Sequence, residues 1–260
     1  MKNIKYFFNI FVAILTVYSA TSQNISGKAT YKIQISKDFT MINKEKLKAI
    51  PTAYVDEIKK SMTALDQRIK LNIKYIENNL SFNQKEAIYK SISGLDNDGY
   101  NGLKEIMIMT GSYGLYYFNK NTNKKLRQID AYGQLFLISS KLNARKWTLT
   151  QESKTIRGYL CYKATSTLVT KNSVGTFYKP VIAWYAPKLP VPYGPKGYGG
   201  LPGLILQLTE GDFTFYVSKL TLNPKKQVVI KKPTKGKKVS EGEFLAIGLQ
   251  STSHFGKFNH

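Results

Sequence analysis

The chain has 260 residues and a formal net charge of +23 at pH 7, from 39 lysines and arginines against 16 aspartates and glutamates. This length suits one large domain or two small ones, with a core that needs no disulfide. Cys161 is the only cysteine, which excludes an internal disulfide. We expect it to be a buried structural residue rather than a reactive thiol.

The charge comes almost entirely from lysine, because only four of the basic residues are arginine: Arg68, Arg127, Arg145 and Arg157. Arginine supplies the rigid fork that grips phosphates and guanine edges, whereas lysine is a hydrated point charge. No specific nucleic-acid partner is therefore expected. We interpret the charge as a compositional bias that favours solubility and weak attraction to anionic surfaces such as an outer membrane.

The first 22 residues have the pattern of a secretory signal peptide. Lys2 and Lys5 precede an apolar stretch over residues 7–20, and Ala20-Thr21-Ser22 offers small residues for cleavage. An uncleaved anchor is the alternative, but this stretch is shorter than the roughly 20 residues that span a bilayer. The sequence predicts cleavage near Ser22, export to the periplasm or outer membrane, one domain over residues 23–260, and no transmembrane segment in the mature chain.

Strand patterns dominate the rest of the chain, with one amphipathic helix expected over residues 52–70. Tyr31, Ile33 and Ile35 alternate with polar residues, which is typical of a half-buried strand. The helix prediction rests on Pro51 as a start signal and on apolar residues at helical spacing from Tyr54 to Ile69. Early strands are predicted over residues 27–39, 71–77, 80–84, 104–110, 115–119, 125–129 and 134–139.

Later strands are predicted over residues 181–186, 204–208 and 212–222, after two strands within 147–169 that meet near Lys154. The apolar alternation in 212–222 changes phase, which indicates a β-bulge near Ser218. Ser240 and Glu243 match a capping box, so a short helix over residues 244–249 is expected. The fold class is mainly β with some α: a strongly curved antiparallel sheet or half-open barrel, with the amphipathic helix packed on it.

A lysine-rich segment, residues 225–238, precedes the capping box. Its seven lysines are accompanied by no acidic residue, which predicts a mobile hairpin or solvated loop, with an electrostatic contact site as the alternative. These lysines are Lys225, Lys226, Lys231, Lys232, Lys235, Lys237 and Lys238.

Residues 187–203, here called the Pro/Gly segment, contain five of the nine prolines and five glycines. Proline withholds a backbone donor and glycine costs backbone entropy, so the segment is neither helix nor central strand. Leu201-Pro202-Gly203-Leu204 predicts a type II turn, after which Leu204 and Ile205 enter an apolar strand. The glycines permit close packing, which we expect to be against the protein's own sheet, with a ligand as the alternative.

The hexapeptide GLPGLI, residues 200–205, carries a resemblance to the GLPGLI family of exported bacterial envelope proteins. Further matching positions are Trp147, Glu152, Lys154, Ile156, Gly158, Tyr159, Cys161, Lys163, Ala164, Trp184, Tyr185, Pro190, Gly194 and Pro195. Gln207 departs from the pattern, which has an acidic residue after the apolar strand. The resemblance implies an exported β-rich protein of unknown function, found in envelopes that rely on outer-membrane importers.

No catalytic motif stands out in the sequence. Both histidines, His254 and His260, lie in the last seven residues, which excludes a three-histidine zinc site, and we expect no metal or other cofactor. Glu152, Glu210 and Asp212 flank predicted strands, so a hydrolase that uses two carboxylates stays an alternative. No catalytic residue is assigned.

The aromatic residues suggest a binding surface instead. A curved sheet lined by Trp147, Tyr159, Trp184 and Tyr185 would present an apolar face to a lipid tail, peptide or glycan, with core packing as the alternative. Tyr193 and Tyr198 of the Pro/Gly segment would form its rim. The leading hypothesis is a non-catalytic envelope protein that binds a hydrophobic or peptide-like ligand or supports an outer-membrane transporter. A polyanion-binding role for the lysines is a further alternative.

Overall fold

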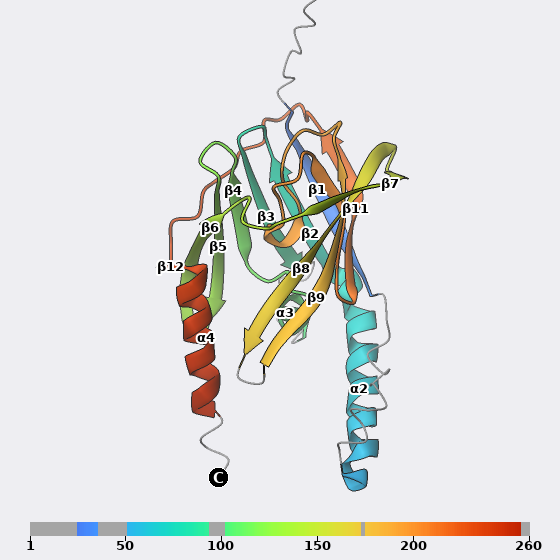
Figure 1. Cartoon of the computed structure of the whole chain (residues 1–260), viewed down its shortest axis with the longest axis vertical. Helices are drawn as coiled ribbons and strands as arrows, with labels where there is room; N and C mark the ends of the chain where they lie inside the picture. The colour runs from blue at the N-terminus through green and yellow to red at the C-terminus, as the bar shows by residue number, and fades with distance from the viewer. Residues whose placement is uncertain (1–24, 36–50, 94–101, 173–174, 256–260) are drawn as a thin grey trace, which may run out of the picture.

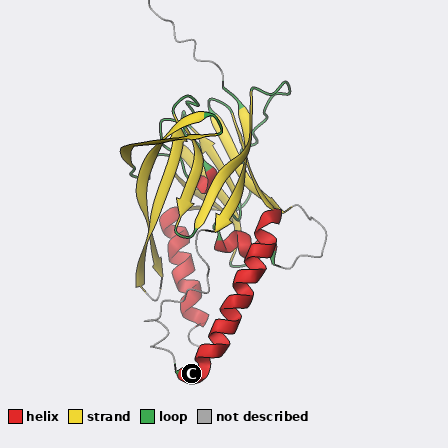
Figure 2. Ribbon diagram, turned by 90° about the vertical axis from the view of Figure 1, so that its right-hand side faces the viewer, coloured by secondary structure: helices red, strands yellow, loops and turns green. Residues whose placement is uncertain are grey.

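The computed structural model describes residues 25–35, 51–93, 102–172 and 175–255. The predicted signal peptide, residues 1–22, lies outside the described residues. The described chain is mainly β and forms one open sheet of twelve strands in the order β12-β6-β5-β4-β3-β2-β1-β11-β10-β9-β8-β7. Neighbouring strands pair antiparallel except β12, which pairs parallel with β6. Figures 1 and 2 show this sheet with the helices at one end.

Twelve strands of the described chain form the sheet, and a β-bulge in one of them lies where the sequence predicts it. They are β1 Gly27–Ile35, β2 Ile76–Phe82, β3 Glu86–Ser93, β4 Leu115–Asn119, β5 Lys124–Ala131, β6 Gln134–Lys141, β7 Thr148–Ile156, β8 Tyr159–Asn172, β9 Gly175–Ala186, β10 Leu204–Glu210, β11 Phe213–Leu222 and β12 Lys237–Ser240. Thr30 pairs with Lys219 and Tyr31 with Val217, which leaves Ser218 as the extra residue. The bulge predicted near Ser218 is confirmed, and the Ser218 hydroxyl donates to the Thr30 carbonyl oxygen at 3.0 Å.

In the described part of the chain, three α-helices accompany the sheet: α2 Thr52–Asn72, α3 Leu103–Met109 and α4 Glu241–Phe255. Helix α2 forms where Pro51 and the apolar spacing predict one. Only its C-terminal part reaches the core, where Ile69 is buried, while Tyr54 is 58 % exposed. The helix was expected to lie on the sheet, but both views place most of it beyond the strands, at the same end as α4.

Some local strand predictions are wrong. Residues 104–110 were expected to be a strand, but α3 forms because Leu103, Ile106 and Met107 bury one helical face. Residues 71–77 and 80–84 were expected as two strands. Instead α2 continues into a 3₁₀ turn, η1 Ile73–Tyr75, and a single strand β2 follows.

The turn between β7 and β8 lies later than the predicted position near Lys154. Arg157 and Gly158 both have positive φ, 52° and 82°, which is the geometry of a two-residue type I′ hairpin. Ile156 then pairs with Tyr159.

The C-terminal elements confirm the capping box. The Glu243 carboxylate accepts from the Ser240 backbone N–H at 2.6 Å, and the Ser240 hydroxyl accepts from the Glu243 N–H at 3.2 Å. The backbone hydrogen bond from Ser240 is the main reason why the pKa of Glu243 is lowered. The resulting helix α4 is longer than the predicted 244–249. Its Phe244 packs against Phe136 of β6.

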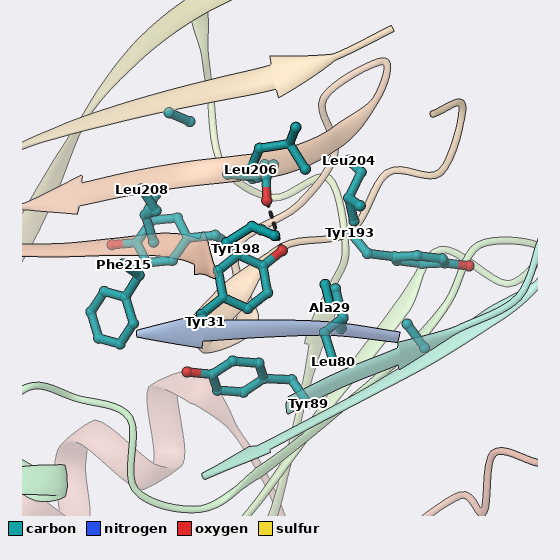
Figure 3. Close-up of a cluster of buried hydrophobic side chains, with 14 of the residues drawn as sticks. Ala29, Tyr31, Leu80, Tyr89, Tyr193, Tyr198, Leu204, Leu206, Leu208 and Phe215 are labelled. Carbon is teal, nitrogen blue, oxygen red and sulfur yellow. Dashed lines mark hydrogen bonds between the residues drawn. The ribbon is translucent and has the colours of Figure 1, made fainter. Parts of the chain in front are cut away.

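The core contains an unusual number of tyrosines. Tyr31 and Tyr89 are fully buried, their rings 6.4 Å apart, and the Tyr31 hydroxyl donates to the Ile205 carbonyl oxygen at 2.7 Å (Figure 3). This hydrogen bond ties β1 to β10 at the point where the Pro/Gly segment rejoins the sheet. A buried hydroxyl needs such a partner, so the core carries polar anchors within an apolar interior.

Candidate ligand-binding groove

A groove of about 1060 Å³ lies between α4 and β8. Its floor includes residues 196–199 of the Pro/Gly segment, and its walls include residues 166–169 of β8 and residues 244, 245 and 249 of α4. A groove of this size is comparable to the pockets that bind drug-sized ligands. Apolar residues that line it include Leu168 and Val169 of β8 and Phe244, Leu245 and Leu249 of α4. Val169 and Leu245 are 54 % and 45 % exposed, so parts of both walls face solvent.

The floor of the groove holds a buried ion pair. Lys196 lies in the 3₁₀ turn η2 Pro195–Gly197 and has left-handed dihedral angles, φ 55° and ψ 29°. Its Nζ lies 3.0 Å from Glu210 Oε2, and its side chain is almost inaccessible. Burial lowers the pKa of Lys196, and the neighbouring Glu210 carboxylate opposes that shift. A non-glycine residue in the left-handed region is strained, and such strain concentrates at functional sites.

Tyr198 completes this arrangement from the same segment. Its hydroxyl donates to Glu210 Oε2, and the Arg145 guanidinium lies over its ring at 4.5 Å. Burial raises the pKa of Tyr198, and the Glu210 carboxylate raises it further. Glu210 therefore accepts hydrogen bonds from Lys196 and Tyr198, both held by the Pro/Gly segment.

The groove is positively charged. Six basic residues line it: Lys125, Arg127, Lys141, Arg145, Lys146 and Lys196. Only two acidic residues, Glu210 and Glu241, accompany them, and each is within ion-pair distance of a lysine. Arg127 lies 5.2 Å from the Tyr116 ring centroid, and its Nε is buried without a hydrogen-bond partner among the described residues. This excess of cations favours a ligand that carries negative charge.

The structure does not gather the predicted aromatic residues on one surface. Trp184 and Tyr185 are consecutive in β9, so their side chains point to opposite faces of the sheet. Trp184 lies under Lys154 Nζ at 4.3 Å, whereas Tyr185 contacts the Tyr162 ring. Tyr159 lies at the start of β8, beside the hairpin turn.

Trp147, Tyr193 and Tyr198 meet the Pro/Gly segment in different ways. Trp147 Nε1 donates to the Gly199 carbonyl oxygen at 3.0 Å, and its ring lies 6.2 Å from that of Tyr198. Tyr193 is fully buried against Phe118. Of the six predicted binding aromatics, Tyr198 is the one that lines the groove.

Most of the motif residues pack against the protein's own sheet, which is the expected arrangement. Buried among them are Gly194, Pro195, Leu201, Gly203, Leu204 and Ile205, whereas Gly200 and Pro202 are exposed. A Cβ added to Gly203 would lie 2.3 Å from the Ala186 carbonyl oxygen. The Ile205 N–H donates to the Tyr193 carbonyl oxygen at 3.0 Å. The predicted type II turn at 201–204 is wrong, because the positive φ that it requires at Gly203 is found instead at Gly200, 84°.

The three carboxylates considered for hydrolysis do not share the groove. Glu210 lines it, but Glu152 forms an exposed ion pair with Lys163 at 2.8 Å, and Asp212 lies in the turn between β10 and β11. Within the described ranges, no group of three histidine, cysteine, aspartate or glutamate side chains is placed to hold a metal ion.

The lysine-rich segment is not a hairpin. It is irregular up to β12, Val228 and Pro233 are buried, and the Lys235 carbonyl oxygen accepts from Gln128 Nε2 at 2.8 Å. Its seven lysines are all exposed, and Lys237 and Lys238 belong to β12. The segment is therefore a solvated strap attached along its length. None of these lysines lines the groove.

Sequence reasoning missed Lys196, Arg127 and Arg145 as groove residues. One signal was present: Lys196 is flanked by Pro195 and Gly197 inside a segment otherwise poor in charge. The arginines carried no local signal, because their positions depend on pairing between distant strands.

In comparisons with known proteins, a short part of the chain matches an uncharacterised family. A family model described as a protein of unknown function (Porph_ging) matches residues 171–207. That range includes the GLPGLI hexapeptide, so the proposed resemblance is compatible with the match but is not confirmed by it. A search of curated proteins found no match.

Two solved structures show a limited likeness. They are described as PNGF-II in C2 and P21 space groups, with 13 % and 14 % sequence identity and TM-scores of 0.49 and 0.48. Each match covers 86 % of this chain, and the chain spans about a third of the length of the matched proteins, 32 % and 33 %.

Proposed function

We propose that this protein is a non-catalytic exported envelope protein that binds an elongated, partly apolar anion in the groove between α4 and β8. The observation that carries the proposal is the groove itself, with six basic side chains around a floor made by the Pro/Gly segment and apolar residues along its walls. Apolar walls with a few polar groups are typical of ligand sites.

The geometry favours binding over bond cleavage in this groove. Glu210 and Glu241 are its two acidic residues, and the first is held by Lys196 and Tyr198 while the second pairs with Lys125 at 3.3 Å. A general base needs a free carboxylate near its target proton. Because these two carboxylates are matched by Lys196 and Lys125, the excess positive charge offered to an anion comes from Arg127, Lys141, Arg145 and Lys146.

The proposal extends to the shape of the sheet, the location of the protein and its partner. We take the open sheet to be a strongly curved half-open barrel whose mouth is the groove. Cleavage near Ser22 would deliver the protein to the periplasm or outer membrane, where an outer-membrane transporter is the proposed partner. Among the described residues, no helix combines the length and apolar character needed to cross a membrane.

Calorimetric titration tests the binding proposal with two anionic probes, hexadecanoate and the peptide acetyl-Asp-Val-Asp-Val-Asp-Val-amide. We expect one binding site for at least one probe and a loss of at least tenfold in affinity in Leu245→Asp, which places a negative charge on the groove wall. Val229→Asp is the matched control, because Val229 is 71 % exposed and does not line the groove. Absence of binding by both probes, or equal loss in both variants, would refute the proposal.

A further inference from the structure

Strand β8 has a free edge beside the groove. It runs from Tyr159 to Asn172, but its pairing with β7 reaches only Thr165, which is opposite Thr148. From residue 166 to residue 172, β8 pairs only with β9 on its other side, within the described part of the chain. Residues 166–169 of this free stretch also form part of the groove wall.

The backbone groups of Thr167 and Val169 point toward this free edge. Thr167 is opposite Pro180 of β9, and proline has no N–H to donate. The Pro180 carbonyl oxygen accepts from the Gly211 N–H at 3.1 Å, on the side away from β8. Thr167 therefore makes no ladder hydrogen bonds with β9. Ladder hydrogen bonds alternate along an antiparallel pair, so the backbone N–H and C=O of Val169, two residues further on, point the same way as those of Thr167.

Two side-chain contacts agree with this orientation. Thr150 Oγ1 of β7 donates to the Lys163 carbonyl oxygen at 3.2 Å. Lys163 is four residues before Thr167 in the same strand, so the backbone groups of both residues point to the β7 side. Arg145 Nη1 donates to the Thr167 carbonyl oxygen at 3.3 Å, from the side where β7 would continue. Open edges of this kind accept an added strand.

The charges beside the edge select the kind of strand. Arg145 and Lys146 precede β7, and the Lys146 carbonyl oxygen accepts from the Ser166 hydroxyl at 2.7 Å, so this basic stretch borders the free edge. Both residues line the groove together with Lys141. An extended chain along the edge would place alternate side chains in the groove. Carboxylates at those positions would meet the arginine and lysines.

We propose that an extended acidic segment of a partner protein adds as a strand to residues 166–171 of β8, with its carboxylates in the groove near Arg145 and Lys146. This inference rests on the proposed function, since it names the ligand of the same groove. The added strand would exchange main-chain hydrogen bonds with Thr167 and Val169. The weak bond from Arg145 to Thr167 would be replaced by a charge-assisted one to the ligand.

N-methylated peptides provide the sharpest test with the unmodified protein. In acetyl-Asp-Val-Asp-Val-Asp-Val-amide, methylation of the aspartate nitrogens removes one alternating set of N–H donors, and methylation of the valine nitrogens removes the other. A paired strand uses only one set toward β8, so we expect one methylated peptide to lose at least tenfold in affinity and the other to stay within about threefold. Equal effects of the two modifications would overturn the proposal.

Variants of β8 and its basic neighbour provide the second test. Val169→Pro removes a donor that faces the free edge and leaves the β9 ladder intact, so peptide affinity should fall at least tenfold while Val169→Thr retains it. Arg145→Gln should weaken peptide binding about tenfold, whereas Lys226→Gln, the same charge change on the exposed strap, should not.

The remaining outcomes separate this inference from the function on which it rests. Binding of hexadecanoate without the peptide would overturn strand addition and leave the groove as a ligand site. Binding of neither probe would remove both proposals. The protein could instead form concentration-dependent dimers that Val169→Pro abolishes, with no peptide binding. That result would assign the edge to a second copy of this chain and overturn the proposed acidic partner. Should Val169→Pro fail to fold, the methylated peptides still decide.

Discussion

The Pro/Gly segment, residues 187–203, and residues 225–236 of the lysine-rich strap both lack regular strands, yet the first is mostly buried and the second is mostly exposed. Residues 193–199 are buried without interruption, whereas the strap buries only Val228 and Pro233. The difference follows from side chains. Small or rigid residues let backbone pack on backbone, while long charged side chains keep their heads in water. An irregular segment is therefore not necessarily a mobile one.

Replacing Gly203 with Val should have the largest effect, because the new Cβ would overlap the Ala186 carbonyl oxygen. We expect a loss of about 3 kcal/mol or more in the free energy of unfolding, or failure to fold. Urea denaturation measures it. Gly242→Val is the control, since nothing lies closer than 4.0 Å to the added atom, and its change should stay within about 1 kcal/mol. A fully stable Gly203→Val protein that loses only ligand binding would contradict packing of this glycine on its own sheet.

Removing the carboxylate beneath the Pro/Gly segment should have the next largest effect. Glu210→Gln leaves the Lys196 ammonium buried without its counter-charge, and loss of one partner of a buried pair costs about 3 kcal/mol. The double variant Lys196→Met with Glu210→Gln should recover most of that loss, since the orphaned charge is gone. Chemical denaturation of both proteins checks the prediction. A double variant no more stable than Glu210→Gln would show that the pair is not the cause.

Alkaline pH should destabilise the core that the Pro/Gly segment completes. Burial raises the pKa of Tyr31, Tyr89, Tyr116, Tyr193 and Tyr198 above the ordinary value near 10. The folded state thus keeps protons that the unfolded state loses, so their contribution is complete below about pH 10 and declines as the pH rises above it. Burial lowers the pKa of Lys196, so just below about pH 10.5 the unfolded chain binds a proton that the folded chain lacks. In that range this residue makes stability rise with pH, opposite to the tyrosines.

The alkaline prediction can be tested at a single tyrosine. The Tyr193 hydroxyl has no hydrogen-bond partner among the described residues, so Tyr193→Phe should change stability little at pH 8. Above pH 10 it should make the loss of stability shallower by about 1.4 kcal/mol per pH unit. Thermal or urea unfolding between pH 8 and pH 11 measures both. An unchanged slope would show that this hydroxyl already ionises in the folded protein.

Changes in the strap should have the smallest effect. Replacing Lys225, Lys226, Lys231 and Lys232 with glutamine removes four exposed charges and should alter the free energy of unfolding by less than about 0.5 kcal/mol per residue. Adsorption to a polyanion such as heparin at low salt should weaken, because counterion release scales with the number of contacts. A column elution series in salt measures it. A large loss of stability would mean that the strap, like the Pro/Gly segment, is part of the core.

The sequence by itself determined the features that depend on neighbouring residues: a mainly β chain, the helix after Pro51, the bulge at Ser218, the capping box at Ser240 and a proline- and glycine-rich segment without regular strands. Each has a local physical cause in side-chain period, turn chemistry or capping. Tertiary structure decided the rest. It buried Lys196, separated Trp184 from Tyr185, made residues 103–109 a helix and, within the described residues, left the end of β8 paired on one side only. Those outcomes depend on which distant strands pair and on what covers each face, and no short window of sequence contains that information.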